Sequence, residues 1–172
     1  MAGLTTLLVL GGARSGKSRH AQVRAEAMDA AALVYIATAQ ALDEEMADRI
    51  ARHRADRGPR WRTVEAPLDL AGTIAAEARP GAVLLVDCLT LWASNLMFAQ
   101  ADIAAETARL VAAIGAAKGP LILVANEVGL GIVPDNALAR AFRDAAGMIN
   151  QAVAAAVDEA VFMAAGLPLR LK

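Results

Sequence analysis

Short apolar runs alternate with longer amphipathic segments along most of the chain. Four of these runs are six or seven residues long and consist mainly of Leu, Val, Ile and Ala. Apolar runs of this length that lack polar alternation are typical of strands buried on both faces of a sheet. They predict strands at residues 4–10, 33–38, 82–87 and 120–125.

The segments between these runs repeat apolar side chains every three or four residues, which is the spacing of an amphipathic helix. The clearest helix has an apolar face from Leu138 to Ala156, and Asp135, directly after Pro134, is its predicted N-cap. The amphipathic spacing predicts helices at residues 17–28, 40–56, 67–78, 89–97, 103–117 and 135–156.

The remaining apolar positions predict three shorter strands. Residues 61–65 form one, and residues 160–164 and 167–171 are predicted to form an antiparallel hairpin around Gly166. Strands that alternate with helices favour a parallel sheet covered by helices on both faces, with ligands at the carboxyl ends of the strands. We therefore expect residues 1–172 to form one three-layer α/β domain with an antiparallel C-terminal edge strand.

The composition narrows the class of protein. The chain has 172 residues, of which 57% are hydrophobic, and its 17 basic and 18 acidic side chains almost cancel. Neutral charge and an aromatic content of only 3% argue against a nucleic-acid-binding surface. The single cysteine, Cys88, cannot form an internal disulfide, and no apolar run is long enough to span a membrane. We expect a cytoplasmic protein that binds phosphates only locally.

A phosphate-binding loop follows the first predicted strand. In the pattern Gly-x4-Gly-Lys-Ser, backbone N–H groups surround a phosphate, Lys17 neutralises β- and γ-oxygens, and Ser18 ligates Mg²⁺. The alternative, a glycine-rich turn without a ligand, is disfavoured because the motif lies between a buried strand and a helix. The expected nucleotide-binding residues are Gly11, Gly12, Ala13, Arg14, Ser15, Gly16, Lys17 and Ser18.

A P-loop also needs an acidic partner for the metal ion. Asp87 ends the predicted strand at residues 82–87 and is the candidate, with Ser18, for holding Mg²⁺. The alternative is that Asp87 merely caps the helix that begins near Leu89.

The segment between residues 43 and 62 has acids at its start and arginines after them. This order suits a helix dipole, so a solvated helix with an exposed histidine explains much of the segment. His53 lies among these arginines, which would hold phosphates beside an imidazole nucleophile. From the residues alone both interpretations stay open, whereas His20 is more consistent with a structural role. The arginines are Arg49, Arg52, Arg54, Arg57, Arg60 and Arg62.

Several linked motifs resemble those of the bifunctional adenosylcobinamide kinase/adenosylcobinamide-phosphate guanylyltransferase family of cobalamin biosynthesis. The resemblance extends over nearly the whole chain and implies a P-loop NTPase fold of the RecA-like type. It rests on residues 11–20, 36–38, 49–50, 53–54, 61–65, 126–134, 140–144 and 150–151.

The resemblance implies two reactions. The first is phosphorylation of the aminopropanol hydroxyl of adenosylcobinamide by ATP or GTP, and the second is transfer of GMP from GTP to that phosphate through a guanylylated histidine. His53 matches the position of that histidine, and the family is expected to form a homotrimer. Further nucleotide-binding residues implied in this way are Ala37, Thr38, Ala39, Arg54, Ala55, Asp56, Arg57, Glu65 and Asp87.

Two other functions remain alternatives. A simpler small-molecule kinase would use the arginine-rich segment as a lid over ATP, and His53 would then be incidental. A P-loop switch would instead use the nucleotide to control a partner. The apolar loop at residues 128–134 is predicted either to contact the corrinoid or to pack beneath the long helix.

Overall fold

A computed structural model of the protein describes residues 5–40 and 44–172. Within the helix Glu44–Arg57, the side chains at positions 45, 46, 49, 52–54 and 56 lie outside the described part. The strands are β1 Thr6–Gly11, β2 Ala32–Ala37, β3 Trp61–Glu65, β4 Ala82–Asp87, β5 Leu121–Asn126, β6 Glu159–Ala164 and β7 Leu167–Arg170. The helices are α1 Lys17–Glu26, α2 Glu44–Arg57, α3 Leu70–Glu77, α4 Leu89–Phe98, α5 Ile103–Ala116 and α6 Ala137–Ala156.

The strands form a seven-stranded sheet in the order β3-β2-β4-β5-β1-β6-β7. All neighbouring pairs are parallel except β6 and β7, which are antiparallel. The turn between these two strands has positive φ at Ala165 (51°) and Gly166 (80°), as a tight two-residue hairpin requires. The predicted C-terminal edge hairpin is therefore confirmed.

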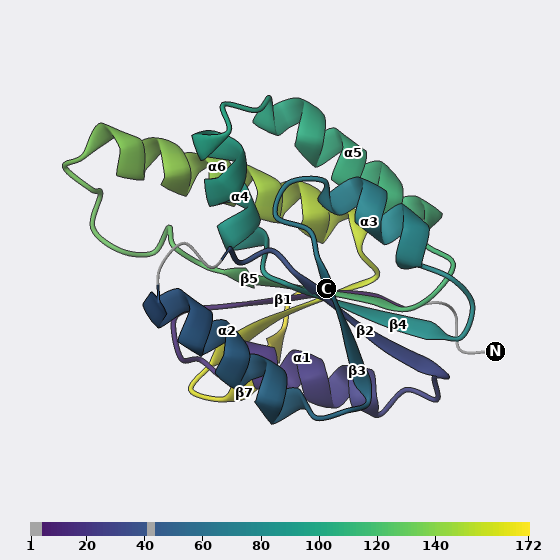
Figure 1. The fold of residues 1–172 in the computed structure, drawn as a ribbon. Helices are drawn as coiled ribbons and strands as arrows, with labels where there is room; N and C mark the ends of the chain where they lie inside the picture. Colours follow the sequence, from purple (N-terminus) through teal and green to yellow (C-terminus); the bar gives the residue numbers. More distant parts are fainter. Residues whose placement is uncertain (1–4, 41–43) are drawn as a thin grey trace.

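Helices cover both faces of the sheet (Figure 1), with α1 and α2 on one side and α3 to α6 on the other. Two apolar clusters fill the spaces between these layers. The larger one, beneath α3 to α6, contains Trp92, which is completely buried and donates its indole N–H to the Leu68 carbonyl at 2.8 Å. The expected three-layer α/β sandwich is confirmed.

Most predicted boundaries agree with the structure to within a few residues, but the predicted N-cap of the last helix is wrong. Asn136, not Asp135, caps α6, because its side-chain oxygen accepts hydrogen bonds from the backbone N–H groups of Leu138 (2.8 Å) and Ala139 (3.1 Å). The Asp135 carbonyl instead accepts a hydrogen bond from Arg140 Nη1 at 2.7 Å, which keeps Asp135 in the preceding loop. Asp and Asn are equally good caps, so pattern alone could not choose between neighbours.

Across residues 5–40 and 44–172, no helix has the length and apolar character needed to cross a bilayer.

Candidate nucleotide site

The phosphate-binding loop joins β1 to α1 and is packed tightly against β6. A Cβ atom on Gly11 would lie 2.8 Å from the Met163 carbonyl oxygen, so a side chain there would collide with backbone. Gly16 has φ of 92°, a left-handed conformation that favours glycine. The backbone N–H of Gly166, in the β6–β7 turn, donates to the Ser15 carbonyl at 3.0 Å. The C-terminal hairpin thus fixes the shape of the loop.

Two polar side chains of this loop are placed to meet an anion. Lys17 Nζ donates to the Gly12 carbonyl at 3.0 Å, which folds the ammonium group back over the loop. The Ser15 hydroxyl is buried and has no hydrogen-bond partner among the described residues. A buried polar atom without a partner is costly, and a bound phosphate would supply one. The start of α1 adds unpaired backbone N–H groups.

Asp87 ends β4 and is linked to α2 through Tyr35. Burial, followed by the nearby charge of Asp87, raises the pKa of Tyr35, while Arg57 acts in the opposite direction. The Arg57 guanidinium lies 3.4 Å from the centre of the Tyr35 ring. The alternative that Asp87 caps α4 is wrong, because the N-cap residue is Cys88 and it makes no side-chain capping bond.

The register of the sheet places two further predicted nucleotide-binding residues, Ala37 and Glu65, in line with Asp87. Ala37 is paired with both Glu65 on β3 and Asp87 on β4, so these three residues form one row at the carboxyl edge. Ala37 and Thr38 are buried, Ala39 is half-buried and Glu65 is exposed. Only β5 separates β4 from β1, so the row lies on the same edge of the sheet as the phosphate-binding loop.

Thr38 ties the ends of β2 and β4 together. Its hydroxyl donates to the Cys88 carbonyl at 2.7 Å and accepts from the Cys88 N–H at 2.8 Å, and its side chain is fully buried. Asn95 Nδ2 on α4 also donates to the Thr38 carbonyl, at 2.8 Å. The backbone that borders the predicted nucleotide site is therefore held from two sides.

Replacing Thr38 with valine is expected to lower the free energy of unfolding by about 1–3 kcal/mol, because two buried backbone groups of Cys88 would lose a partner. Urea denaturation would measure this loss. Thr73→Val is the matched control, since the Thr73 hydroxyl makes an exposed bond to the Asp69 carbonyl and its loss should cost less than about 0.5 kcal/mol. Equal destabilisation by the two variants would contradict the bridging role of Thr38.

The predicted histidine nucleophile lies on α2, which covers the same face of the sheet as α1 (Figure 1). The side chains of His53, Arg54 and Asp56 lie outside the described part, whereas Ala55 is exposed and Arg57 is half-buried against Tyr35. His20, on α1, is half-buried, and burial followed by the nearby charge of Arg24 lowers its pKa. A lowered pKa keeps the His20 imidazole neutral near pH 7.

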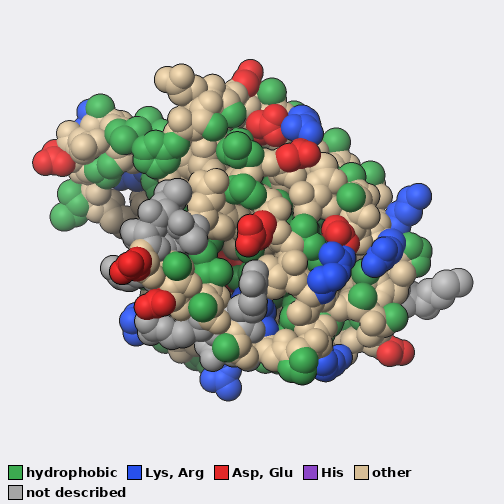
Figure 2. Space-filling view, viewed as in Figure 1, with side chains coloured by type: hydrophobic (Ala, Val, Ile, Leu, Met, Phe, Trp, Pro, Cys, Tyr) green, Lys and Arg blue, Asp and Glu red, His purple; other side chains and the backbone are tan. Residues whose placement is uncertain are grey.

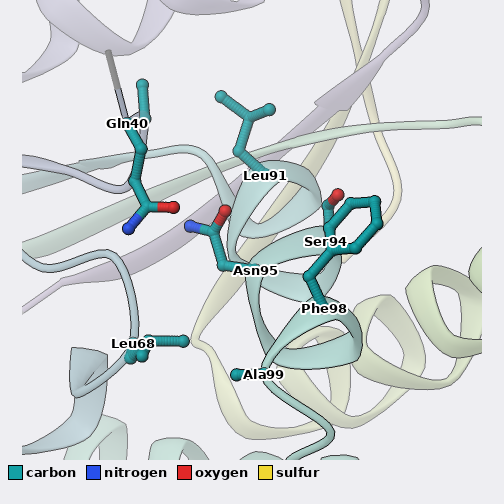
Figure 3. A pocket seen from close by; sticks show the side chains of 8 residues that line it. Gln40, Leu68, Leu91, Ser94, Asn95, Phe98 and Ala99 are labelled. Atoms are coloured by element: carbon teal, nitrogen blue, oxygen red, sulfur yellow. The ribbon is translucent and has the colours of Figure 1, made fainter. Parts of the chain in front are cut away.

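A hollow of about 400 Å³ lies beside the end of β2, on the side covered by α4 (Figure 3). Its walls are mainly apolar, and the side-chain amides of Gln40 and Asn95 face each other across it. The sequence pattern did not indicate this hollow, because its walls come from three separate segments. They are Ala39, Gln40, Leu68, Leu91, Ser94, Asn95, Phe98 and Ala99.

The loop between β5 and α6 begins beside the phosphate-binding loop and then runs out into solvent. The Glu127 N–H donates to the Gly11 carbonyl at 3.0 Å. Further along, Leu130, Ile132 and Val133 are 80%, 96% and 61% exposed, so the expectation that this loop packs beneath the long helix is wrong. Figure 2 shows hydrophobic side chains at the end of the molecule formed by this loop and the start of α6.

Glu127 was not among the predicted site residues, although it directly follows a predicted strand. Because the carboxyl ends of parallel strands meet at one edge, a polar residue after residues 120–125 is a candidate for the same site as Asp87. The sequence shows that Glu127 follows a predicted strand. It does not show the strand order, which makes Glu127 a neighbour of Gly11.

Solved structures of low sequence identity have a similar fold. A prototypical ATPase from the type III secretion system of pathogenic bacteria gives a TM-score of 0.56 at 13% identity, over 92% of this chain and 50% of that one. The flagellar accessory protein FlaH from Methanocaldococcus jannaschii gives a TM-score of 0.52 at 13% identity, over 98% of this chain and 78% of that one. These likenesses establish the expected P-loop NTPase fold and nothing further.

Sequence relatives are much closer. The bifunctional adenosylcobalamin biosynthesis protein CobP of Pseudomonas aeruginosa is 50% identical, with 96% of each chain covered. CobU of Salmonella typhimurium, which bears the same description, is 45% identical over 96% of this chain and 99% of the relative. Residues 7–171 match the family described as cobinamide kinase / cobinamide phosphate guanyltransferase, and the chain belongs to that family.

Proposed function

We propose that the protein phosphorylates the aminopropanol hydroxyl of adenosylcobinamide with ATP or GTP, and then transfers GMP from GTP to the new phosphate, releasing pyrophosphate. The proposal rests on the phosphate-binding loop, which presents Lys17 and the buried Ser15 hydroxyl. It also rests on the match of the chain to this family. ATP, GTP and the corrinoid are the proposed substrates.

In the first reaction, residues Gly11 to Ser18 hold the triphosphate. Lys17 stabilises the charge that develops on the phosphate oxygens, and the loop N–H groups fix their positions. Ser18 and Asp87 are the proposed ligands of Mg²⁺, which would neutralise phosphate charge when bound. One hydroxyl and one carboxylate fit this ion, which takes its other ligands from phosphates and water. Among the described residues, no group of three or more His, Cys, Asp or Glu side chains is placed to hold a metal ion.

In the second reaction, His53 is the proposed nucleophile. Its imidazole nitrogen forms a bond to the α-phosphorus of GTP while the bond from that phosphorus to the β-phosphate oxygen breaks, so pyrophosphate leaves. A phosphate oxygen of cobinamide phosphate then attacks the same phosphorus and releases the histidine. Lys17 and the arginines beside His53 would stabilise the charge of the leaving group.

The remaining predicted residues would position the guanylyl group. We assign Arg54, Ala55, Asp56 and Arg57 to its neighbourhood, with Ala37, Thr38 and Ala39 along the other side. Glu65 and Asp87 are both proposed to contact GTP, and one of the two is proposed to read guanine, because a carboxylate can accept paired hydrogen bonds from guanine N1 and N2, which adenine cannot donate. The contact of Arg57 with Tyr35 supports this assignment by fixing the end of α2 near Asp87.

The direct test is to incubate the wild-type protein with GTP labelled at the α-phosphate and to follow the label. We expect acid-labile, alkali-stable label on the protein, which moves to cobinamide phosphate when that acceptor is added. Kinase turnover without protein labelling would favour a simple kinase with an arginine-rich lid. Nucleotide binding without turnover of cobinamide would favour a switch, and either result would overturn the two-step proposal.

The exposed apolar loop is the proposed contact surface for the corrinoid. Replacing Ile132 with aspartate is expected to raise the KM for cobinamide by about 10- to 100-fold, because burial of an isoleucine side chain contributes about 1.5–3 kcal/mol. Labelling of the protein by GTP should not change, since Ile132 is almost fully exposed in the free protein. Steady-state kinetics with varied cobinamide would measure the effect.

Val23→Asp provides the matched control, because Val23 is also an exposed apolar residue but lies on α1. An unchanged KM for Ile132→Asp, or an equal rise in both variants, would contradict corrinoid binding at the loop.

We also propose that the protein is a cytoplasmic homotrimer. An unusually apolar edge strand supports self-association: Leu167, Leu169 and Leu171 are all more than half exposed at the end of the sheet. Leu169 is paired with Phe162 on β6, so these side chains share one face.

A further inference from the structure

We propose that Glu127 is the general base of the phosphorylation step and takes the proton from the attacking hydroxyl. This role rests on the proposed function. The structure supports it through three features of Glu127, which are its place in the sheet, the way its carboxylate is held and the loop that follows it.

Strand order places Glu127 between the two parts of the phosphate site. β5 lies between β1, which leads into the phosphate-binding loop, and β4, which ends at Asp87. Asn126 is paired with Gly11, and the next residue, Glu127, donates its N–H to the Gly11 carbonyl at 3.0 Å. Glu127 therefore lies at the carboxyl edge of the sheet, directly beside the phosphate-binding loop, where ligands bind in open α/β folds.

The carboxylate is held in place by a local hydrogen bond. Glu127 Oε1 accepts this bond from the Gly129 N–H at 2.6 Å, which ties the side chain to the backbone two residues further on. Immediately before it, the Asn126 N–H donates to the Thr90 hydroxyl at 2.7 Å, which anchors the end of β5 to α4. Glu127 is half-buried. A base that is fixed and partly shielded from water is suited to proton transfer.

Other carboxylates at this edge are less well placed. Neighbouring strands are about 4.8 Å apart, so Asp87 lies about 10 Å from the β1 axis and Glu65 about 19 Å from it. Asp87 also lies close enough to Tyr35 to influence its pKa and is the proposed metal ligand. Glu127 directly follows β5, the strand beside β1, so it lies nearer to the phosphate-binding loop than Asp87 or Glu65 does, and no metal role is proposed for it.

The loop after Glu127 would bring the acceptor to it. The exposed Leu130, Ile132 and Val133 follow within six residues, and the proposal is that a corrinoid held against them extends its aminopropanol arm toward Glu127. In the reaction, the hydroxyl oxygen forms a bond to the γ-phosphorus as the bond from that phosphorus to the β-phosphate oxygen breaks. The nucleoside diphosphate leaves, and the hydroxyl proton passes to the Glu127 carboxylate and then to water.

Glu127→Gln separates this role from the rest of the function. We expect kcat for phosphorylation of cobinamide to fall by about 10²–10⁴-fold, the usual contribution of a general base, with little change in the KM for ATP. Guanylyl transfer to preformed cobinamide phosphate, which has no hydroxyl proton to remove, should continue at the wild-type rate.

Asp135→Asn is the matched control, since Asp135 is an exposed acid of the same loop and should leave both activities unchanged. Unaltered kinase activity in Glu127→Gln would overturn the proposal, and so would a parallel loss of both activities, which would indicate that Glu127 only holds the turn at Gly129. A wild-type protein without any cobinamide kinase activity would instead overturn the proposed function, and the role of Glu127 with it.

Discussion

Replacing His53 with alanine is expected to lower guanylyl transfer by at least about 10³-fold, because the variant lacks the atom that forms the covalent intermediate. Phosphorylation of cobinamide should stay within a few-fold of the wild-type rate, since that step transfers the γ-phosphate directly to the hydroxyl. GTP labelled at the α-phosphate measures the first activity, and GTP or ATP labelled at the γ-phosphate measures the second.

His20→Ala is the control for the histidine experiment, because His20 and His53 are the two histidines of the chain. His20 lies on α1, directly after the phosphate-binding loop, and its Nε2 is buried without a hydrogen-bond partner among the described residues. We expect His20→Ala to retain the label. If the label persists in His53→Ala and disappears in His20→Ala, the nucleophile is His20 on α1. The arginine-rich helix α2 would then act as a lid.

The layers of the fold were predictable from the sequence because burial leaves a direct pattern. Strands that are buried on both faces, such as Leu121–Asn126, must be continuously apolar, and α6 must keep one face apolar over its whole length. Local choices with nearly equal energies were less predictable. Asp135 and Asn136 are both good N-caps, and the structure shows that Asn136 caps a helix that begins at Ala137.

The candidate site was predictable where one short segment carries its chemistry. The phosphate-binding loop is contiguous, so its position in the fold could be predicted from spacing, and the roles given to its residues stay predictions. Contacts that join distant segments could not be predicted from the sequence, because they depend on strand order. Examples are the bond between Gly166 and Ser15, the bridge from Thr38 to Cys88 and the place of Glu127 beside Gly11.

The composition of the loop between β5 and α6 did not predict whether its apolar side chains are buried or exposed. Its apolar residues were compatible both with burial and with a binding surface, and only the structure shows that Ile132 faces solvent. An apolar side chain that stays exposed on folding contributes no burial energy within the free chain. Its exposure is therefore better explained by a ligand or partner than by folding.

Replacing Lys17 with methionine is expected to lower both phosphorylation and guanylyl transfer by at least about 10³-fold, equivalent to about 4 kcal/mol of transition-state stabilisation. Methionine keeps an unbranched side chain in the place of the lysine stem. Within the protein itself, the substitution removes the hydrogen bond from Lys17 Nζ to the Gly12 carbonyl. The free energy of unfolding should therefore change by only about 1 kcal/mol.

The comparison of the two rates in Lys17→Met decides how the nucleotide sites are organised. If the phosphate-binding loop serves both reactions, both rates fall together. The same Lys17 ammonium group then stabilises the donated γ-phosphate in one step and the leaving pyrophosphate in the other. Lys118→Ala, which removes an exposed lysine after α5, should leave both rates unchanged. Loss of the kinase rate alone would require a second site for GTP near His53, and Lys17 would then act only on the γ-phosphate.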